Sequence, residues 1–454
     1  MKINSLKYIM LLMAAFIMGC DAFLDVDIPK DQLNTQKVFT DDRTATSALT
    51  NVYSNMRKAG FLSGSANGAG YLLGCYADET EAMDAESSDF KSFYDGSVTG
   101  NNAAVAGLWT STYKQIYIVN NVIEGLQTSE GVSENIKNRL YGEALSVRGL
   151  LHFYLAQTFG DIPYVNTTDY EVNRRIHKTG VAEAVKLAIA DLVKAETLVD
   201  ENYPSSEKVR INKAVVRALL ARMYLYTENW FLARQYAEMV MDEPSYDLES
   251  LENVFLKQSR SAIWQLKPEL DGRNTAEAES YIFEALPPKY IRASLFLTGS
   301  FESGDLRKDM WLHFVGGTEN AHAYKYKVKG NSTPSKEYSV IIRLEEIYLI
   351  AAEASGELGD MEKCTALLNS LRNRAGLASI SVTNNTDAVN AVLKERKAEL
   401  FCEFGHRFYD LKRRNRLDDL LSSKPFWKEH FKRLPLPENE LSLNRNLLPQ
   451  NPGY

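Results

Sequence analysis

Cysteine is scarce in this chain, with four residues among 454. One of them, Cys20, lies in a distinct N-terminal segment, which leaves Cys75, Cys364 and Cys402. Three cysteines cannot all pair, and the chain has no Cys-x-x-Cys and no histidine–cysteine cluster with zinc-ligand spacing. Cys364 and Cys402 each lie inside a helical pattern, and we interpret them as small buried apolar residues. These features exclude a fold held by disulfides and give no indication of a zinc site.

Motifs of common catalytic sites are also missing. None of the six histidines belongs to a His-Glu-x-x-His motif, and Gly-x-Ser-x-Gly does not occur where a strand would lead into a helix. An excess of positive charge is absent too, because 52 basic and 59 acidic residues give a net charge of −7. The sequence therefore predicts no catalytic residues, no cofactor and no nucleic-acid partner.

One acidic cluster is a possible cation site, since calcium prefers oxygen ligands. It lacks the Asp-x-Asp-x-Asp-Gly order of a calcium loop, so a solvated acidic loop is the favoured interpretation and no metal site is predicted. The cluster consists of Asp78, Glu79, Glu81, Asp84, Glu86 and Asp89.

Long apolar runs are limited to the N-terminus. Lys2 and Lys7 precede an apolar run over residues 8–18, which is followed by Gly19 and Cys20. The run is shorter than the roughly 20 residues that a membrane-spanning helix needs, and its flanks are typical of a secretory signal peptide. Ile-Met-Gly-Cys resembles the lipobox of bacterial lipoproteins, which predicts removal of residues 1–19 and acylation of Cys20. The alternative is an ordinary signal peptide cut near Gly19.

Helical periodicity dominates the rest of the chain and predicts an all-α fold. We expect an extended leader over residues 20–40 and one domain over 41–454, with loop-rich surface excursions at 60–107 and 243–337. A short strand is expected at 261–266. Helices are expected at 41–56, 109–123, 133–158, 181–198, 212–227, 229–241, 340–358, 360–375 and 387–404.

Two helix pairs show the alternation of small and large residues that is typical of tetratricopeptide units. One pair covers residues 220–240 and the other covers 351–371. Such pairs expose an apolar face and need a neighbour, so we expect a helical repeat array. The distance between the pairs along the chain predicts that the 243–337 excursion interrupts the array.

Several blocks together resemble one known family, the SusD/RagB-type outer-membrane lipoproteins of Bacteroidetes. The resemblance spans nearly the whole chain after Cys20, with small departures at Gly149, where alanine is common, and at Phe404, where the family usually has glutamate near Gly405. The blocks are Cys20 to Asp25; Trp109, Tyr113, Ile116 and Asn120; Arg148 to Tyr164; Arg343 to Ala354; Glu395 to Arg413; and Leu434 to Tyr454, which ends in Gln-Asn-Pro-Gly-Tyr.

The resemblance implies a SusD-like helical fold and a binding function. It implies capture of a glycan, or of a peptide as in RagB-like members, at the outer-membrane surface. The ligand would pass to a TonB-dependent SusC-like barrel, and acyl chains on Cys20 would hold the protein to the membrane.

In this family the binding residues lie in the excursions, here 61–106 and 268–334. Aromatic rings stack on the apolar faces of sugars, so exposed aromatics there are candidates. We expect Phe93, Tyr94 and Trp311 to form a shallow stacking surface, whereas Trp109 and Trp264 belong to the core. The alternative for each candidate is packing of its loop onto the scaffold. The full set is Phe93, Tyr94, Trp311, Tyr71, Tyr76, Tyr281 and Tyr324, with Phe90 beside them.

The charged residues of the Glu395–Arg413 block are expected to be structural. Their spacing follows one helix and its exit, and opposite charges in so dense a motif favour a semi-buried network over a ligand role. We therefore predict that Arg407 pairs with Glu399, Glu403 and Asp410.

Overall fold

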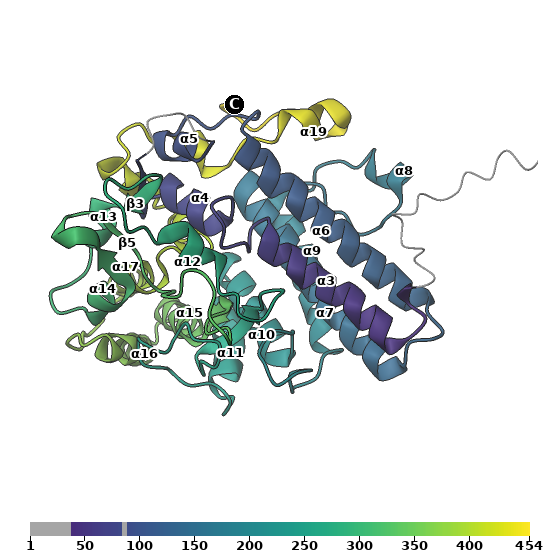
Figure 1. Ribbon diagram of the computed structural model, residues 1–454, viewed down its shortest axis with the longest axis horizontal. Helices are drawn as coiled ribbons and strands as arrows, with labels where there is room; N and C mark the ends of the chain where they lie inside the picture. The colour runs from purple at the N-terminus through teal and green to yellow at the C-terminus, as the bar shows by residue number, and fades with distance from the viewer. Residues whose placement is uncertain (1–37, 84–88) are drawn as a thin grey trace, which may run out of the picture.

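The computed structural model describes residues 38–83 and 89–454. The predicted signal peptide, Cys20, most of the predicted leader and two acidic residues of the cluster, Asp84 and Glu86, lie outside the described residues. Helices dominate the described chain, as predicted (Figure 1). Within the described ranges, no helix is both long and apolar enough to span a membrane.

Nine long helices of the described chain form a continuous stack in which each helix packs against the next along the chain. Figure 1 shows the first of them lying side by side, whereas short strands and helices gather at the opposite end of the molecule. The stack consists of α3 (Asp42–Lys58), α6 (Ala103–Thr128), α7 (Glu134–Phe159), α9 (Val181–Glu196), α10 (Lys213–Tyr226), α11 (Trp230–Met241), α15 (Leu344–Glu357), α16 (Met361–Arg374) and α17 (Asn385–Leu400).

The 243–337 excursion does not interrupt this stack in space. Helix α11 packs directly against α15, so the two tetratricopeptide-like pairs are neighbours. Small buried residues such as Ala237 on α11 and Ala351 on α15 carry the close approach expected from the sequence. The excursion leaves the array after α11 and returns to it at α15.

Two boundaries differ from the prediction for local reasons. Helix α6 begins at Ala103 rather than near residue 109, because the side chain of Asn102 accepts hydrogen bonds from the backbone of Ala104 and Val105. Residues 339–343 form a strand rather than the start of a helix, since they pair with the strand found at 262–266. Helix α15 starts only after Arg343.

The first excursion is not a surface loop over its first part. Helix α4 (Ala69–Tyr76) is buried along its whole length, and Phe61 and Leu62 before it are also buried. A segment that is apolar on every side shows no helical periodicity, which explains why the prediction of a surface excursion is wrong here.

Short elements complete the fold, and the described strands form three two-stranded antiparallel sheets, β1–β3, β2–β6 and β4–β5. The strands are β1 (Thr80–Ala82), β2 (Ala262–Leu266), β3 (Ile291–Ala293), β4 (Leu312–Phe314), β5 (Ala321–Ala323) and β6 (Ser339–Arg343). The helices are α5 (Asp89–Asp95), α8 (Tyr170–Asn173), α12 (Ala276–Tyr281), α13 (Leu295–Thr298), α14 (Leu306–Trp311), α18 (His406–Arg413) and α19 (Glu438–Leu443), with 3₁₀ turns η1 (Val315–Gly317), η2 (Leu417–Ser422), η3 (Glu429–Lys432) and η4 (Arg445–Leu447).

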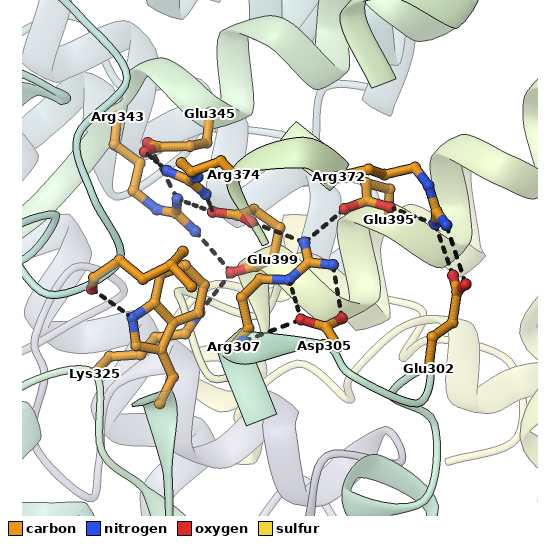
Figure 2. A network of polar contacts seen from close by, with 12 residues as sticks. Glu302, Asp305, Arg307, Lys325, Arg343, Glu345, Arg372, Arg374, Glu395 and Glu399 are labelled. Carbon is orange, nitrogen blue, oxygen red and sulfur yellow. Dashed lines mark hydrogen bonds and ion pairs between the residues drawn. The ribbon is translucent and has the colours of Figure 1, made fainter. Parts of the chain in front are cut away.

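A buried network of charged side chains fastens the second excursion to the array (Figure 2). At its centre Glu399 of α17 accepts hydrogen bonds from Arg307, Arg343 and Arg374 at 2.9, 2.6 and 2.6 Å. Burial alone would raise the pKa of Glu399, but the three guanidinium charges outweigh it and hold that pKa well below its ordinary value. Because Arg307 lies on α14, the network fixes the helix that leads directly into β4.

The predicted semi-buried network is confirmed, but the partner predicted for Arg407 is wrong. Arg407 donates to Asp78 at 2.8 and 3.0 Å, whereas Asp410 pairs with Arg396 and Arg413. Asp78 comes from the first excursion and lies 329 residues before Arg407 in the chain, so helix spacing alone could not reveal the pair.

Candidate functional site

The two excursions meet in the β1–β3 sheet. Strand β1 from the first excursion pairs with β3 from the second, so that Glu81 lies opposite Arg292. Strand β3 packs against β5, which brings the β4–β5 sheet alongside. Figure 1 shows β3, β5 and α13 together at the end of the molecule away from the long α3, α6 and α7 helices.

Arg292 is the polar centre of this surface. Its guanidinium contacts Glu81 at 2.9 Å, Glu319 at 3.0 Å and the side-chain oxygen of Asn320 at 3.1 Å. Glu319 is exposed, and Arg292 is partly exposed. Carboxylate, amide and guanidinium groups therefore converge at the solvent boundary, and each can hydrogen-bond a hydroxyl group.

Aromatic rings flank the Arg292 cluster on the β1 side. Tyr290, next but one to Arg292, is 47% exposed and meets the half-buried Phe90 edge to face at 6.1 Å between ring centroids. Tyr94 of α5 is also half-buried, and the Lys424 ammonium lies 3.6 Å from its ring centroid. Burial, and then the charge of Glu81, raises the pKa of the Tyr94 hydroxyl. That hydroxyl stays neutral and able to donate.

A second aromatic group lies on the β4–β5 sheet. His313 and His322 are directly paired across the strands, and Tyr324 lies 5.3 Å from the His313 ring. Phe314 is 37% exposed on the same short strand as His313. Burial lowers the pKa of His322 to about 4, so that this imidazole is neutral near pH 7. The group therefore adds apolar ring faces without positive charge from His322.

We name this region the β1–β3 surface. Exposed rings beside converging polar groups are the combination that binds sugars, because ring faces pack on the C–H faces of a pyranose while the polar groups bind its hydroxyls. It comprises Glu81, Phe90, Tyr94, Tyr290, Arg292, Glu319 and Asn320, with the β4–β5 sheet beside it.

The stacking surface expected from Phe93, Tyr94 and Trp311 is not formed. Trp311 is fully buried, donates from its indole N–H to the backbone oxygen of Leu251 at 2.9 Å and packs on Phe255. Phe93 is likewise fully buried against Tyr76. Both rings serve the packing role that we left as the alternative.

Three further candidates are also core residues. Tyr71, Tyr76 and Tyr281 are at most 6% exposed. Tyr71 packs under Phe90 and beside Tyr281, so it supports the β1–β3 surface from below. Tyr94 lies at the β1–β3 surface and Tyr324 on the adjoining β4–β5 sheet, and ligand contact by them stays a prediction. The assignment of Trp109 and Trp264 to the core is confirmed, as is burial of Cys364 and Cys402.

Sequence reasoning missed Tyr290 and Arg292. Two consecutive prolines, Pro287 and Pro288, precede them, and such a pair marks a loop at the surface. That signal could have found Tyr290. The role of Arg292 depends on pairing with Glu81, which lies 211 residues away along the chain.

The acidic cluster is not a solvated loop at its start. Asp78 and Glu79 are buried, and Asp78 pairs with Arg407 and Lys397. Burial, reinforced by the charge of Asp78, raises the pKa of Glu79 to about 8. Across the residues that the structure describes, no group of three or more acidic, histidine or cysteine side chains could hold a metal ion.

A cleft of about 710 Å³ lies just beyond the C-terminal end of α5. Loop residues 96–100 and the C-terminal tail line it, including His430 and Tyr454. Its rings are already engaged, since His430 packs on Phe431 and on Tyr454. Two internal cavities near Tyr281 and Glu403 hold only about 10 and 20 Å³, space for a water molecule rather than a sugar.

Comparison with known families agrees with this architecture. Residues 22–225 match a family model described as starch-binding and associating with the outer membrane, and residues 311–454 match the SusD family model. The chain belongs to the SusD/RagB family. The predicted resemblance is thereby confirmed, and the two models cover both ends of the helical stack.

Curated relatives of the family are similar over most of the chain. A SusD-like protein P2 of Formosa agariphila is 27% identical over 418 residues, which covers 78% of this chain and 81% of the relative. SusD-like protein P25 of the same organism is 22% identical over the full length of both chains.

Solved structures share the SusD fold. A SusD superfamily protein of Bacteroides vulgatus superposes with a TM-score of 0.81 at 22% identity, covering 92% of this chain and 100% of the other. A laminarin-binding SusD-like protein superposes with a TM-score of 0.76, also at 22% identity, covering 92% of this chain and 100% of the other.

Proposed function

We propose that this protein is a surface lipoprotein that captures an oligosaccharide at the β1–β3 surface and passes it to a TonB-dependent SusC-like barrel. The observation that carries the proposal is the convergence of the two excursions, which places the exposed Tyr290 ring beside the Arg292 cluster. The Tyr290 ring lies two residues before Arg292, whose partners Glu81, Glu319 and Asn320 add polar groups that can bind hydroxyls.

Family members support sugar as the ligand class. The model that matches residues 22–225 is described as starch-binding, and one protein of the same fold binds laminarin. A peptide ligand, as in RagB-like capture, is the alternative, and the charges of Glu81, Arg292 and Glu319 could equally hold a peptide. The binding experiment must therefore offer both.

The test is a binding screen by calorimetry with the purified chain. One arm offers starch and laminarin oligosaccharides, and the other offers a mixture of short peptides. We expect heat of binding in the glycan arm. Binding confined to the peptide arm would show that the ligand is a peptide rather than a glycan. The location of the site would then be tested separately.

We also propose acyl anchoring at Cys20. Two acyl chains give stable membrane attachment, because each buried CH₂ contributes about 0.8 kcal/mol. In cells, Cys20→Ala should move the protein from the membrane fraction to the soluble fraction. Unchanged membrane association of the variant would exclude this anchor.

A further inference from the structure

Two histidine side chains face each other across the β4–β5 sheet, beside the β1–β3 surface. His313 of β4 is paired directly with His322 of β5, so both rings lie on the same face of the sheet. Their ring centroids are 5.3 Å apart, and the ring planes are inclined at 45°. His313 is exposed, whereas His322 is only 2% exposed. The pair therefore joins a ring that is held in the interior to a ring that solvent can reach.

The hydrogen bonding of His322 leaves one of its nitrogens free to act as a ligand. Nδ1 lies 3.1 Å from the backbone oxygen of Ala323, and because that oxygen can only accept, Nδ1 carries the proton. Nε2 therefore keeps its lone pair, and it is buried without a hydrogen-bond partner among the described residues. Burial lowers the pKa of His322 to about 4, so the ring is neutral near pH 7. A metal-ligating histidine usually has this arrangement, with a carbonyl on one nitrogen and a free lone pair on the other.

Packing fixes the direction of this free nitrogen. Because Nδ1 lies next to the backbone, Nε2 is at the outer end of the ring, in the layer of side chains where the His313 ring also lies. Phe283 and Tyr324 both meet the His322 ring edge to face, at 5.1 and 5.6 Å between centroids. The buried imidazole is thus held in one orientation before any ion arrives.

Charges of both signs surround the pair. Lys329 contributes to the lowered pKa of His322, and Lys327 lies over the neighbouring tyrosine ring. The Lys329 ammonium donates to the Ile282 backbone oxygen at 2.8 Å, so it has a partner of its own. Glu319 lies in the connection between β4 and β5, and the exposed Glu284 precedes β3. Because positive and negative groups are mixed, the nitrogen ligands rather than the local charge decide whether a cation binds.

The separation of the two rings fits an ion bound between them. A divalent ion binds an imidazole nitrogen at about 2.0–2.1 Å, which places the ion about 3.1 Å from the centre of each ring. Two such rings at a tetrahedral angle of about 109° have centres about 5.1 Å apart, close to the 5.3 Å found for His313 and His322. His313 is exposed, so a small rotation of its side chain can bring a nitrogen to the ion without disturbing the packing.

We propose that His313 and His322 bind one divalent transition-metal ion between them. Imidazole ligands suit Cu²⁺, Ni²⁺ and Zn²⁺, and the usual order of affinities places Cu²⁺ first. Two protein ligands leave the other coordination positions open on the side of the exposed ring, where water or a donor atom of a captured ligand can bind. The inference does not rest on glycan capture at the β1–β3 surface, so either proposal can fail without the other.

Copper binding can be measured on the full chain without a histidine tag. Cys20→Ala serves as the parent chain, because the change removes the Cys20 thiol from competition, while Cys75, Cys364 and Cys402 are buried. Calorimetry with Cu²⁺ alone gives the affinity and the stoichiometry. Electron paramagnetic resonance counts the nitrogen ligands of the bound ion through their hyperfine coupling.

Two single variants of the parent chain locate the site. His313→Ala removes the exposed ligand, and circular dichroism checks that the variant folds. His177→Ala is the matched control, because His177 is also exposed but lies outside the pair. His322→Gln removes the buried ligand while keeping a polar side chain of similar length.

We expect one Cu²⁺ per parent chain, with two imidazole nitrogens in its resonance spectrum. His313→Ala should weaken binding by roughly tenfold or more, since the loss of even an outer-shell partner of a metal ligand costs about tenfold to hundredfold in affinity. His322→Gln should weaken it as much, and His177→Ala should bind as the parent chain does. Unchanged affinity of folded His313→Ala, an equal loss in His177→Ala, a single nitrogen ligand, or no binding by the parent chain would each overturn the inference.

Discussion

Replacing Glu399 with glutamine tests whether the buried network holds the second excursion to the helical array. The Glu399 carboxylate is fully buried and accepts hydrogen bonds from Arg307, Arg343 and Arg374. Glutamine keeps the shape, but it removes the charge and turns an NH₂ group toward arginine donors. Removing one partner of a buried ion pair costs about 3–5 kcal/mol. We expect a loss of that size in the free energy of unfolding.

The loss should be visible as a lower melting temperature. With an unfolding entropy of about 2.1 cal/mol/K per residue over the roughly 400 residues that the structure describes, 3–5 kcal/mol corresponds to a decrease of about 4–6 °C. Calorimetry and far-UV circular dichroism measure it. Glu183→Gln is the control, because its side chain is 53% exposed and its surface pair with Lys186 should contribute about 1 kcal/mol or less. Wild-type melting of Glu399→Gln, or an equal decrease in the control, would refute the reasoning.

Three further predictions concern charge and stability. The folded-state pKa values of Asp78, Glu346 and Asp410 are lowered, those of Glu346 and Asp410 to about 2. The three carboxylates therefore stabilise the folded protein fully above the ordinary carboxyl pKa of about 4, and this stabilisation is lost as the pH falls toward 2. Acid titration followed by circular dichroism checks this prediction. The pKa of Glu79 is raised instead, so the free energy of unfolding should decline as the pH rises from about 4.5 through 8. Glu79→Gln should therefore be more stable than wild type in urea unfolding at pH 9. An unchanged urea midpoint at that pH would contradict the raised pKa. Arg407→Ala should lose about 3 kcal/mol in denaturant unfolding because Asp78 stays buried beside Lys397 alone, and wild-type stability of this variant would show that the pair is dispensable.

The helical array could be predicted because many of its helices are amphipathic and six of the nine have a side-chain N-cap. Helices α9, α11 and α16 each bury one stripe of small and apolar residues, which a periodicity of 3.6 residues makes visible. Helix α4 is buried on all sides and shows no such period, so it resembled a loop. Local pattern therefore predicts the surface helices well and fails for a short helix inside the core.

For the candidate site, the sequence predicted the two excursions that form it but not most of the residues exposed there. Trp311 stood among charged residues and looked exposed, but Arg307 is buried by pairing with Glu395 and Glu399 from another helix. Polar neighbours in sequence do not show exposure when their partners lie 88 and 92 residues away. The pairing of β1 with β3 also joins segments far apart in the chain. This pairing places Tyr290 beside Glu81 and Arg292.

Calorimetry on Tyr290→Ala tests the central claim, that the β1–β3 surface binds the ligand, most directly. The titrant is the glycan from the starch and laminarin panel that binds the wild-type protein. Loss of a stacking ring costs about 1 kcal/mol or more, which is a fivefold or greater decrease in affinity. Tyr117→Ala is the matched control, because Tyr117 is 48% exposed and Tyr290 is 47% exposed. The account predicts weaker binding by Tyr290→Ala alone, with both variants melting as wild type does. Equal affinities of Tyr290→Ala and wild type would contradict it.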